Sequence, residues 1–216
     1  NGEKVLSCYI FSMKNSIVKA LDVPKEFLIP SHFLNSMNDL YDKGKRHSLI
    51  IELADRVLLN SQYMDRKIER EIRYRLSISL ARSGNSDRFF REIKMIDRAD
   101  SFYLLGFYFR ICGNSDKAIE NLDKFLNLHP TSIKGRRELV QVLIDIEDYE
   151  GALTYAKVIF ENEKLNPYNI QAYIRCLLKV KPTDYKKTVE SLIDTLDKID
   201  TDISKEMFYS AKANYY

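Results

Sequence analysis

Residues 102–130 read FYLLGFYFRICGNSDKAIENLDKFLNLHP. Apolar and small side chains recur in this stretch at helical spacing, on both sides of the polar run 112–116. The positions that set the pattern are Phe102, Leu105, Gly106 and Phe109, then Ala118 and Leu122, and finally Pro130. Gly113 suits the left-handed residue just past a helix end, and Asn114 suits the N-cap of the helix that follows. The stretch therefore predicts two helices joined by a tight turn.

The same pattern repeats along the chain. Ser83-Gly84-Asn85-Ser86-Asp87 recurs as Cys112-Gly113-Asn114-Ser115-Asp116. The last apolar position of each first helix is Leu40, Leu80, Phe109, Leu143 and Leu178, and the last two steps are 34 and 35 residues. Nine residues after each of the first four positions, a second helix core begins at Leu49, Phe89, Ala118 and Ala152. A recurring helix pair of this length indicates a repeat protein.

Small residues mark where the two helices of a pair approach closely. A side chain at Gly106 or Ala118 would push the helix axes apart. Ser77 falls opposite Phe89, and Arg175 falls opposite Thr188. These two pairs are therefore predicted to be looser or rotated.

The spacing of residues 102–130 resembles that of the tetratricopeptide repeat (TPR) family, with Phe in place of the first Trp and of the Tyr, and Leu in place of the later Phe. The resemblance is best over residues 99–167 and extends over about 31–200. It implies an all-α, TPR-like αα-hairpin solenoid wound as a right-handed superhelix. In such arrays the first helices line a concave groove that binds peptides or partner helices.

The predicted organisation has three parts. An N-terminal helix (about 3–21) and a linker occupy residues 1–30. About five helix hairpins fill residues 31–200, at 31–60, 65–98, 99–129, 133–165 and 168–199. Residues 201–216 form a C-terminal capping helix or part of a truncated repeat. Because a repeat of this kind cannot bury its apolar face alone, each hairpin must stack on its neighbours.

The composition fits a packed helical protein. The chain has 216 residues, of which 45% are hydrophobic and 12% aromatic, and it has only seven Gly and five Pro. The net charge of +3 gives no strong electrostatic case for nucleic acid or an anionic membrane. Cys8, Cys112 and Cys176 are odd in number and far apart, which favours a reducing, cytoplasmic location over a disulfide framework. Cys112 and Cys176 are predicted to be core thiols.

The resemblance places a set of first-helix residues in the groove as candidate partner-binding residues. They are Arg75, Arg82, Tyr103, Phe107, Arg110, Lys134, Arg137, Gln141, Asn169 and Tyr173. The basic members favour an acidic segment of a partner, since Arg binds carboxylates bidentately. The alternative is a solvated face neutralised by Glu71, Glu138 and Asp145. The aromatic members are either anchors for a partner or part of the core.

A basic run covers residues 66–75, and two hypotheses account for it. The run could contact phosphates. However, Glu69 with Arg73 and Glu71 with Arg75 are spaced as favourable i,i+4 ion pairs. A salt-bridged exposed helix is the preferred interpretation, and nucleic acid is not the expected partner.

Patterns typical of catalytic and metal sites are not found in the sequence. His32, His47 and His129 are scattered, and none has metal-ligand spacing. Phosphate-binding and dinucleotide-binding glycine motifs are missing, as is a nucleophile elbow. We therefore expect no metal, no cofactor and no enzymatic activity. One TPR subset holds a ligand's C-terminal carboxylate with Lys, Arg and Asn, but that pattern does not occur here at the required spacing.

The predicted function is a non-catalytic protein-interaction scaffold that binds a peptide or partner helix in its groove. The alternative is a regulatory, sensing or oligomerisation segment of a larger signalling or defence effector. Two polar segments, 136–142 and 166–173, resemble TPR segments appended to bacterial multidomain proteins, and the sequence begins without Met at Asn1. The oligomeric state is left open.

Overall fold

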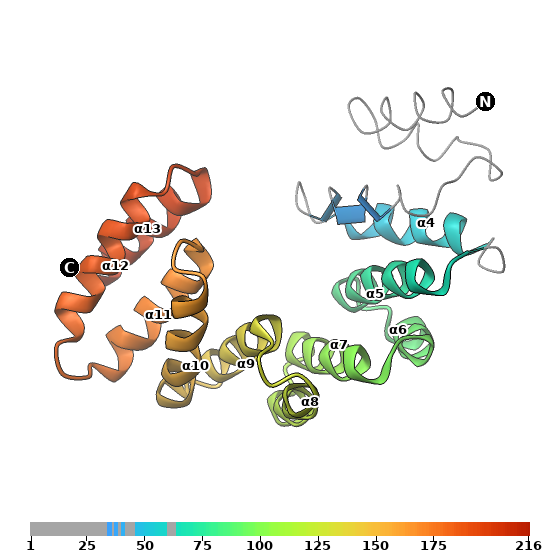
Figure 1. The fold of residues 1–216 in the computed structure, drawn as a ribbon, viewed down its shortest axis with the longest axis horizontal. Helices are drawn as coiled ribbons and strands as arrows, with labels where there is room; N and C mark the ends of the chain where they lie inside the picture. Colours follow the sequence, from blue (N-terminus) through green and yellow to red (C-terminus); the bar gives the residue numbers. More distant parts are fainter. Residues whose placement is uncertain (1–33, 36, 39, 42–45, 60–63) are drawn as a thin grey trace. The chain divides into compact units, whose positions relative to one another are not determined.

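A computed structural model describes residues 34–216, apart from 36, 39, 42–45 and 60–63 (Figure 1). The predicted N-terminal helix and linker lie outside the described residues. From His47 onward, the described part has ten α-helices, one short 3-10 turn and no strands. They are α4 (His47–Leu58), α5 (Arg66–Arg82), α6 (Ser86–Glu92), η3 (Ile93–Met95), α7 (Arg98–Ile111), α8 (Ser115–Leu128), α9 (Ile133–Asp145), α10 (Tyr149–Asn162), α11 (Pro167–Val180), α12 (Tyr185–Lys198) and α13 (Asp202–Tyr215).

The predicted all-α helical-repeat fold is confirmed. Helices adjacent in sequence pack against each other as hairpins, as in α9 with α10 and α11 with α12. The second helix of one hairpin also packs on the first helix of the next, as in α8 on α9 and α10 on α11. The chain divides into two compact units, Asn1–Leu104 (unit 1) and Leu105–Tyr216 (unit 2), with the boundary inside α7. The division predicted from the sequence and the right-handed winding stay predictions.

The core of unit 1 is built on α5, which packs against both α4 and α6. Asp65 begins α5 by accepting hydrogen bonds from the backbone N–H groups of Lys67 and Ile68. The apolar stripe of α5 is fully buried at Ile72, Leu76 and Leu80. The stripe of α4 is likewise buried, at Ile50, Leu53, Ala54 and Val57.

In unit 2, glycines allow the helices to approach closely. A Cβ on Gly106 would lie 2.6 Å from Cγ of Leu122 and 3.3 Å from the backbone oxygen of Ala118. The predicted close approach within the α7–α8 hairpin is therefore confirmed. A Cβ on Gly135 would lie 2.7 Å from the ring of Phe125. The missing side chain of Gly135 therefore allows α9 to pack closely on α8.

Three hairpin turns share one hydrogen-bond pattern. In the first two turns the residue past the helix end is Gly84 or Gly113, with φ of 72° and 74°. The N–H of Gly113 donates to the carbonyl of Arg110, and the N–H of Asn114 donates to that of Phe109. The left-handed glycines predicted from the sequence are thus confirmed. The third turn has the same two bonds but places Glu147 in the left-handed position, with φ of 62°.

The two cysteines in the described part of the chain lie in different environments. Cys176 is buried in α11, as predicted, and burial raises the pKa of its thiol to about 11. The prediction of a core thiol was wrong for Cys112, which is exposed. Cys112 follows the last residue of α7 and belongs to the turn that leads to Gly113, so the helical pattern no longer places it in the core.

The turn at Glu147 predicts a stabilising substitution. Glu147→Gly should raise the free energy of unfolding by about 0.5–1 kcal/mol, because a side chain in the left-handed region costs about 1–2 kcal/mol and the added freedom of the unfolded chain offsets part of the gain. Urea denaturation followed by circular dichroism measures the change. The matched control is Glu150→Gly, three residues on inside α10, which should destabilise. A loss of stability in Glu147→Gly would contradict the turn geometry.

The two thiols should differ sharply in reactivity. At about pH 8 only about one in a thousand Cys176 thiols is ionised, whereas the thiolate is the reactive form. Reactivity of Cys176 should rise only as the pH approaches the raised pKa. Iodoacetamide followed by peptide mass spectrometry should therefore label Cys112 first, and both equally in denaturing guanidinium chloride. Early labelling of Cys176 in the native chain would refute its burial.

Candidate functional site

The predicted groove residues of unit 1 are engaged within the unit. Nε of Arg75 donates to Oδ1 of Asn38 at 2.6 Å, and its Nη1 donates to the carboxylate of Glu71 at 2.5 Å. Tyr103 stacks on Tyr74, with ring centroids 6.2 Å apart. Arg82 is exposed in the last turn of α5. The charge of Arg75 is thus balanced by its own helix.

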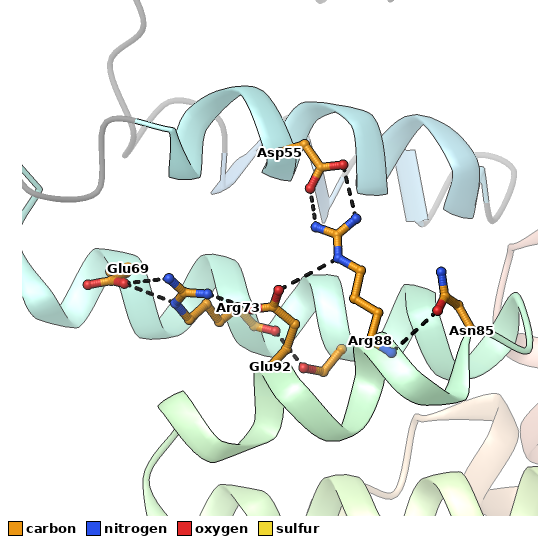
Figure 2. Close-up of polar contacts among 7 residues, drawn as sticks. Asp55, Glu69, Arg73, Asn85, Arg88 and Glu92 are labelled. Atoms are coloured by element: carbon orange, nitrogen blue, oxygen red, sulfur yellow. Dashed lines mark hydrogen bonds and ion pairs between the residues drawn. The ribbon is translucent and has the colours of Figure 1, made fainter.

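The basic run 66–75 forms intrahelical ion pairs. The Arg73–Glu69 pair is 2.8 Å and the Arg75–Glu71 pair is 2.5 Å, so both predicted i,i+4 pairs are confirmed. Figure 2 shows that Arg73 also reaches Glu92, and that Arg88 lies between Glu92 and Asp55. These residues form an ion network that joins α4, α5 and α6.

The ion network is partly shielded from solvent. The side chains of Arg73 and Glu92 are 15% and 13% exposed. Burial lowers the pKa of Arg73, but hydrogen bonds with Glu69 and Glu92 outweigh that effect and raise it. The hydrogen bond with Asp55 is the main cause of the raised pKa of Arg88. Both guanidinium groups therefore stabilise the packing of α4, α5 and α6 in unit 1.

Two predicted groove arginines of unit 2 are also paired. Nε of Arg110 donates to Oε1 of Glu138 at 2.5 Å, and its Nη1 lies 3.6 Å from Asp145. Nε of Arg137 donates to Oδ1 of Asn169 at 2.8 Å, and its Nη2 is paired with Glu163. Each of these arginines connects its helix to a later one, which positions the helices.

The remaining predicted residues of unit 2 lie in different surroundings. Phe107, Asn169 and Tyr173 are buried, at 5%, 1% and 9% exposure. The amide of Asn169 donates to the backbone oxygen of Ile159, and Tyr173 stacks on Phe160 of α10 at 5.5 Å. Exposed Lys134 lies 5.3 Å over the ring of Phe125. The partner-binding role assigned to these residues stays a prediction.

A cavity of about 730 Å³ lies within unit 2, between α9, α11 and α13. These helices alternate in sequence with α10 and α12, and α11 packs against both α9 and α13. One face of α11 supplies most of the lining, with α9 on one side and α13 on the other. The lining residues are Gln141, Ile144, Tyr168, Gln171, Ala172, Ile174, Arg175, Leu178, Lys179, Lys181, Ser210, Ala211 and Asn214.

The lining of this cavity (the α11 pocket) combines an apolar part with hydrogen-bonding groups. Gln141 is the one predicted site residue that it contains. Tyr168 at its edge is 58% exposed. Arg175, Lys179 and Lys181 contribute positive charge, and the lining includes no Asp or Glu. Such a surface can accept hydrogen-bonding and negatively charged groups of a ligand while covering part of its apolar surface.

Most residues that line this pocket were not among the predicted site residues. Asn169 and Tyr173 were predicted to face the groove, yet they pack toward α10. The exposed face carries Tyr168, Gln171 and Arg175. Their spacing of three and four residues was a readable signal. Arg175 is exposed and lines the pocket, and the predicted looser packing of the α11–α12 pair stays a prediction.

Two further features concern metal binding and membrane insertion. Among the described residues, no group of three His, Cys, Asp or Glu side chains is arranged to hold a metal ion. In the same part of the chain, no helix is both long and apolar enough to cross a bilayer.

Comparison with known proteins identifies the fold. No protein-family model matches the sequence, and no curated protein matches it. A solved structure that matches is described as "Crystal structure of YrrB: a TPR protein with an unusual peptide-binding site". The match covers 91% of this chain and 97% of that chain, with a TM-score of 0.51 and 14% sequence identity. The chain therefore has a TPR-like helical-repeat fold, as the sequence resemblance predicted.

The ion network of unit 1 predicts a clear stability effect. Glu92→Gln should lower the free energy of unfolding by about 1–3 kcal/mol, because two shielded guanidinium groups lose a charged partner. Urea denaturation measures the loss.

The control for Glu92→Gln is Glu52→Gln, which breaks the exposed Arg56–Glu52 pair of the same unit. This change should cost less than about 0.5 kcal/mol. Equal effects of the two substitutions would mean that the network contributes no more than a surface ion pair.

Proposed function

We propose that the chain is a non-catalytic protein-interaction scaffold, and that it binds a segment of another protein in the α11 pocket. The binding surface is formed by α9, α11 and α13 of unit 2. The partner segment lies along the exposed face of α11 and covers the apolar part of the pocket.

The observation that carries the proposal is the chemistry of the pocket lining. A volume of about 730 Å³ is within the range of specific ligand sites. Gln141 and Gln171 come from neighbouring helices, and neither amide is hydrogen-bonded to another side chain in the described part of the chain. An amide both donates and accepts, so it matches the N–H and C=O groups of a peptide.

The fold comparison supports this choice. YrrB, whose fold is similar, is described as having an unusual peptide-binding site. Helical-repeat arrays bind along one surface built from successive repeats, and the α11 pocket is such a surface. Arg137 acts as a positioning residue in this proposal, because its hydrogen bond with Asn169 joins α9 to α11, two of the helices that frame the pocket.

The expectations about cofactors, cellular location and a regulatory role are compatible with the same proposal. A scaffold of this kind requires no cofactor and acts in the reducing cytoplasm that the cysteine pattern favours. Regulation of a larger effector protein would use the same surface, with the partner segment then supplied by another part of that protein.

A substitution that fills the pocket tests the proposal. Gln171→Trp places a large ring among the lining residues without altering the buried face of α11. Affinity capture from a lysate of the source organism, read by mass spectrometry, should lose about tenfold or more of each pocket-bound partner. The melting temperature should stay within a few degrees of that of the wild type.

The matched control is Asp194→Trp on the exposed face of α12, which does not line the pocket. This variant should capture the same proteins as the wild type. A capture pattern shared by all three proteins would reject the α11 pocket as the binding surface.

A further inference from the structure

We infer that the α11 pocket binds an extended segment carrying at least two acidic side chains. The inference rests on the proposed function and specifies the ligand of the same site. It follows from three features of the lining: its excess of basic side chains, the distance between them, and the two glutamine amides that bond to no other side chain in the described part of the chain.

The charged side chains that line the pocket are all basic. Arg175, Lys179 and Lys181 line it, and no carboxylate does. Two other arginines of unit 2 have acidic partners, since Arg110 of α7 is paired with Glu138 and Arg137 of α9 is paired with Glu163. A site with net positive charge on an apolar base favours an anionic ligand.

Arg175 is the residue that decides the specificity. Its side chain is exposed on the pocket face of α11, and its guanidinium forms no ion pair with a carboxylate in the described part of the chain. A guanidinium presents a planar fork of N–H donors that matches a carboxylate bidentately. Nζ of Lys179 lies 5.6 Å from the centroid of the Tyr149 ring. This contact restricts where the ammonium group can meet a ligand.

The cations are too far apart for a single carboxylate. Arg175 and Lys179 are four residues apart on α11, which corresponds to about 6 Å along the helix axis. Lys181 lies beyond the helix end, in a left-handed conformation with φ of 52°. Side chains two apart on an extended peptide point to the same side at about 6.6 Å. Two acidic side chains in such a segment match the cation spacing, whereas one terminal carboxylate does not.

The amides favour an extended segment over a helix. Gln141 on α9 and Gln171 on α11 line the pocket from neighbouring helices. Asn214 on α13 is different, because its amide donates to the backbone oxygen of Ser210 at 2.8 Å. A helix satisfies its own backbone groups, but an extended segment leaves N–H and C=O groups that two glutamine amides can bind.

The apolar lining adds a requirement for the other residues of the segment. Ile144, Ile174 and Leu178 come from α9 and α11, and Ala211 comes from α13. Exposed Tyr168 offers an aromatic face at the edge. The segment therefore carries apolar side chains at positions before or after the two acids, where they can cover this surface.

Peptide pools with defined charge test the inference on the whole 216-residue chain. The probe is a pool of acetylated and amidated decapeptides with Glu at two positions two apart and mixed neutral residues elsewhere. A matched pool carries Gln at both positions. Retention on the immobilised chain, read by mass spectrometry, should favour the Glu pool by about tenfold, and the preference should shrink at high salt.

Variants locate the effect within the pocket. Arg175→Glu should abolish the preference for the Glu pool, and Arg175→Lys should keep part of it. Lys187→Glu on the exposed face of α12 makes the same change in net charge away from the pocket and should leave the preference intact. Each variant is accepted only with an unchanged melting temperature, so that loss of folding is not counted as loss of binding.

The outcomes separate this inference from the proposed function. Equal retention of the two pools, with loss of both in Gln171→Trp, would overturn the acidic specificity and leave the pocket as a binding site. Retention of a Glu peptide only when its C-terminus is a free acid would overturn the assignment to side chains. No retention of the Glu pool would overturn the inference as well. Retention unaffected by Gln171→Trp would reject the pocket itself.

Discussion

Close stacking of helix hairpins is the constraint on which the rest of this structure depends. A hairpin buries only part of its apolar surface internally, so the remainder must be covered by the next one. Glycine makes this contact close at two points, Gly106 within the α7–α8 hairpin and Gly135 between α8 and α9. Tight helix packing leaves little room for water between helices, so polar side chains at their edges must find partners inside the array. The shielded ion pairs Arg73–Glu92 in unit 1 and Arg110–Glu138 in unit 2 meet this requirement.

The sequence was sufficient for the fold because the signals for the fold are local. Each of these signals acts within one hairpin: a left-handed glycine, an N-cap, and a small residue where the two helices meet. The turns at Gly84 and Gly113 are as predicted. Glu147 shows where such signals weaken: the third turn keeps the hydrogen bonds of the other two without the glycine. Cys112 shows a second limit, because a helical pattern does not say at which residue the helix ends.

The candidate site was only partly predictable, because it depends on contacts between hairpins. The rotation of α11 about its axis decides which residues face the pocket, and that rotation is set by packing against α10 and α12. Asn169 is polar, yet it is 1% exposed and bonded to the backbone of α10. Gln141, one of the predicted groove residues, lines the pocket. The pairing of Arg137 with Asn169 and Glu163 spans about thirty residues. No periodicity within one helix reveals such a partner.

Arg175 differs from Arg110 and Arg137 in the charge that surrounds it. Arg110 on α7 meets Glu138 of α9, and Arg137 on α9 meets Asn169 of α11 and Glu163 before it. Arg175 on α11 shares its pocket with neutral residues of α13, namely Ser210, Ala211 and Asn214. The earlier arginines therefore contribute their charge to stacking, where a carboxylate of the same chain already compensates it. No carboxylate of α13 lines the pocket beside Arg175, and this is why we propose that a carboxylate of a bound segment pairs with it.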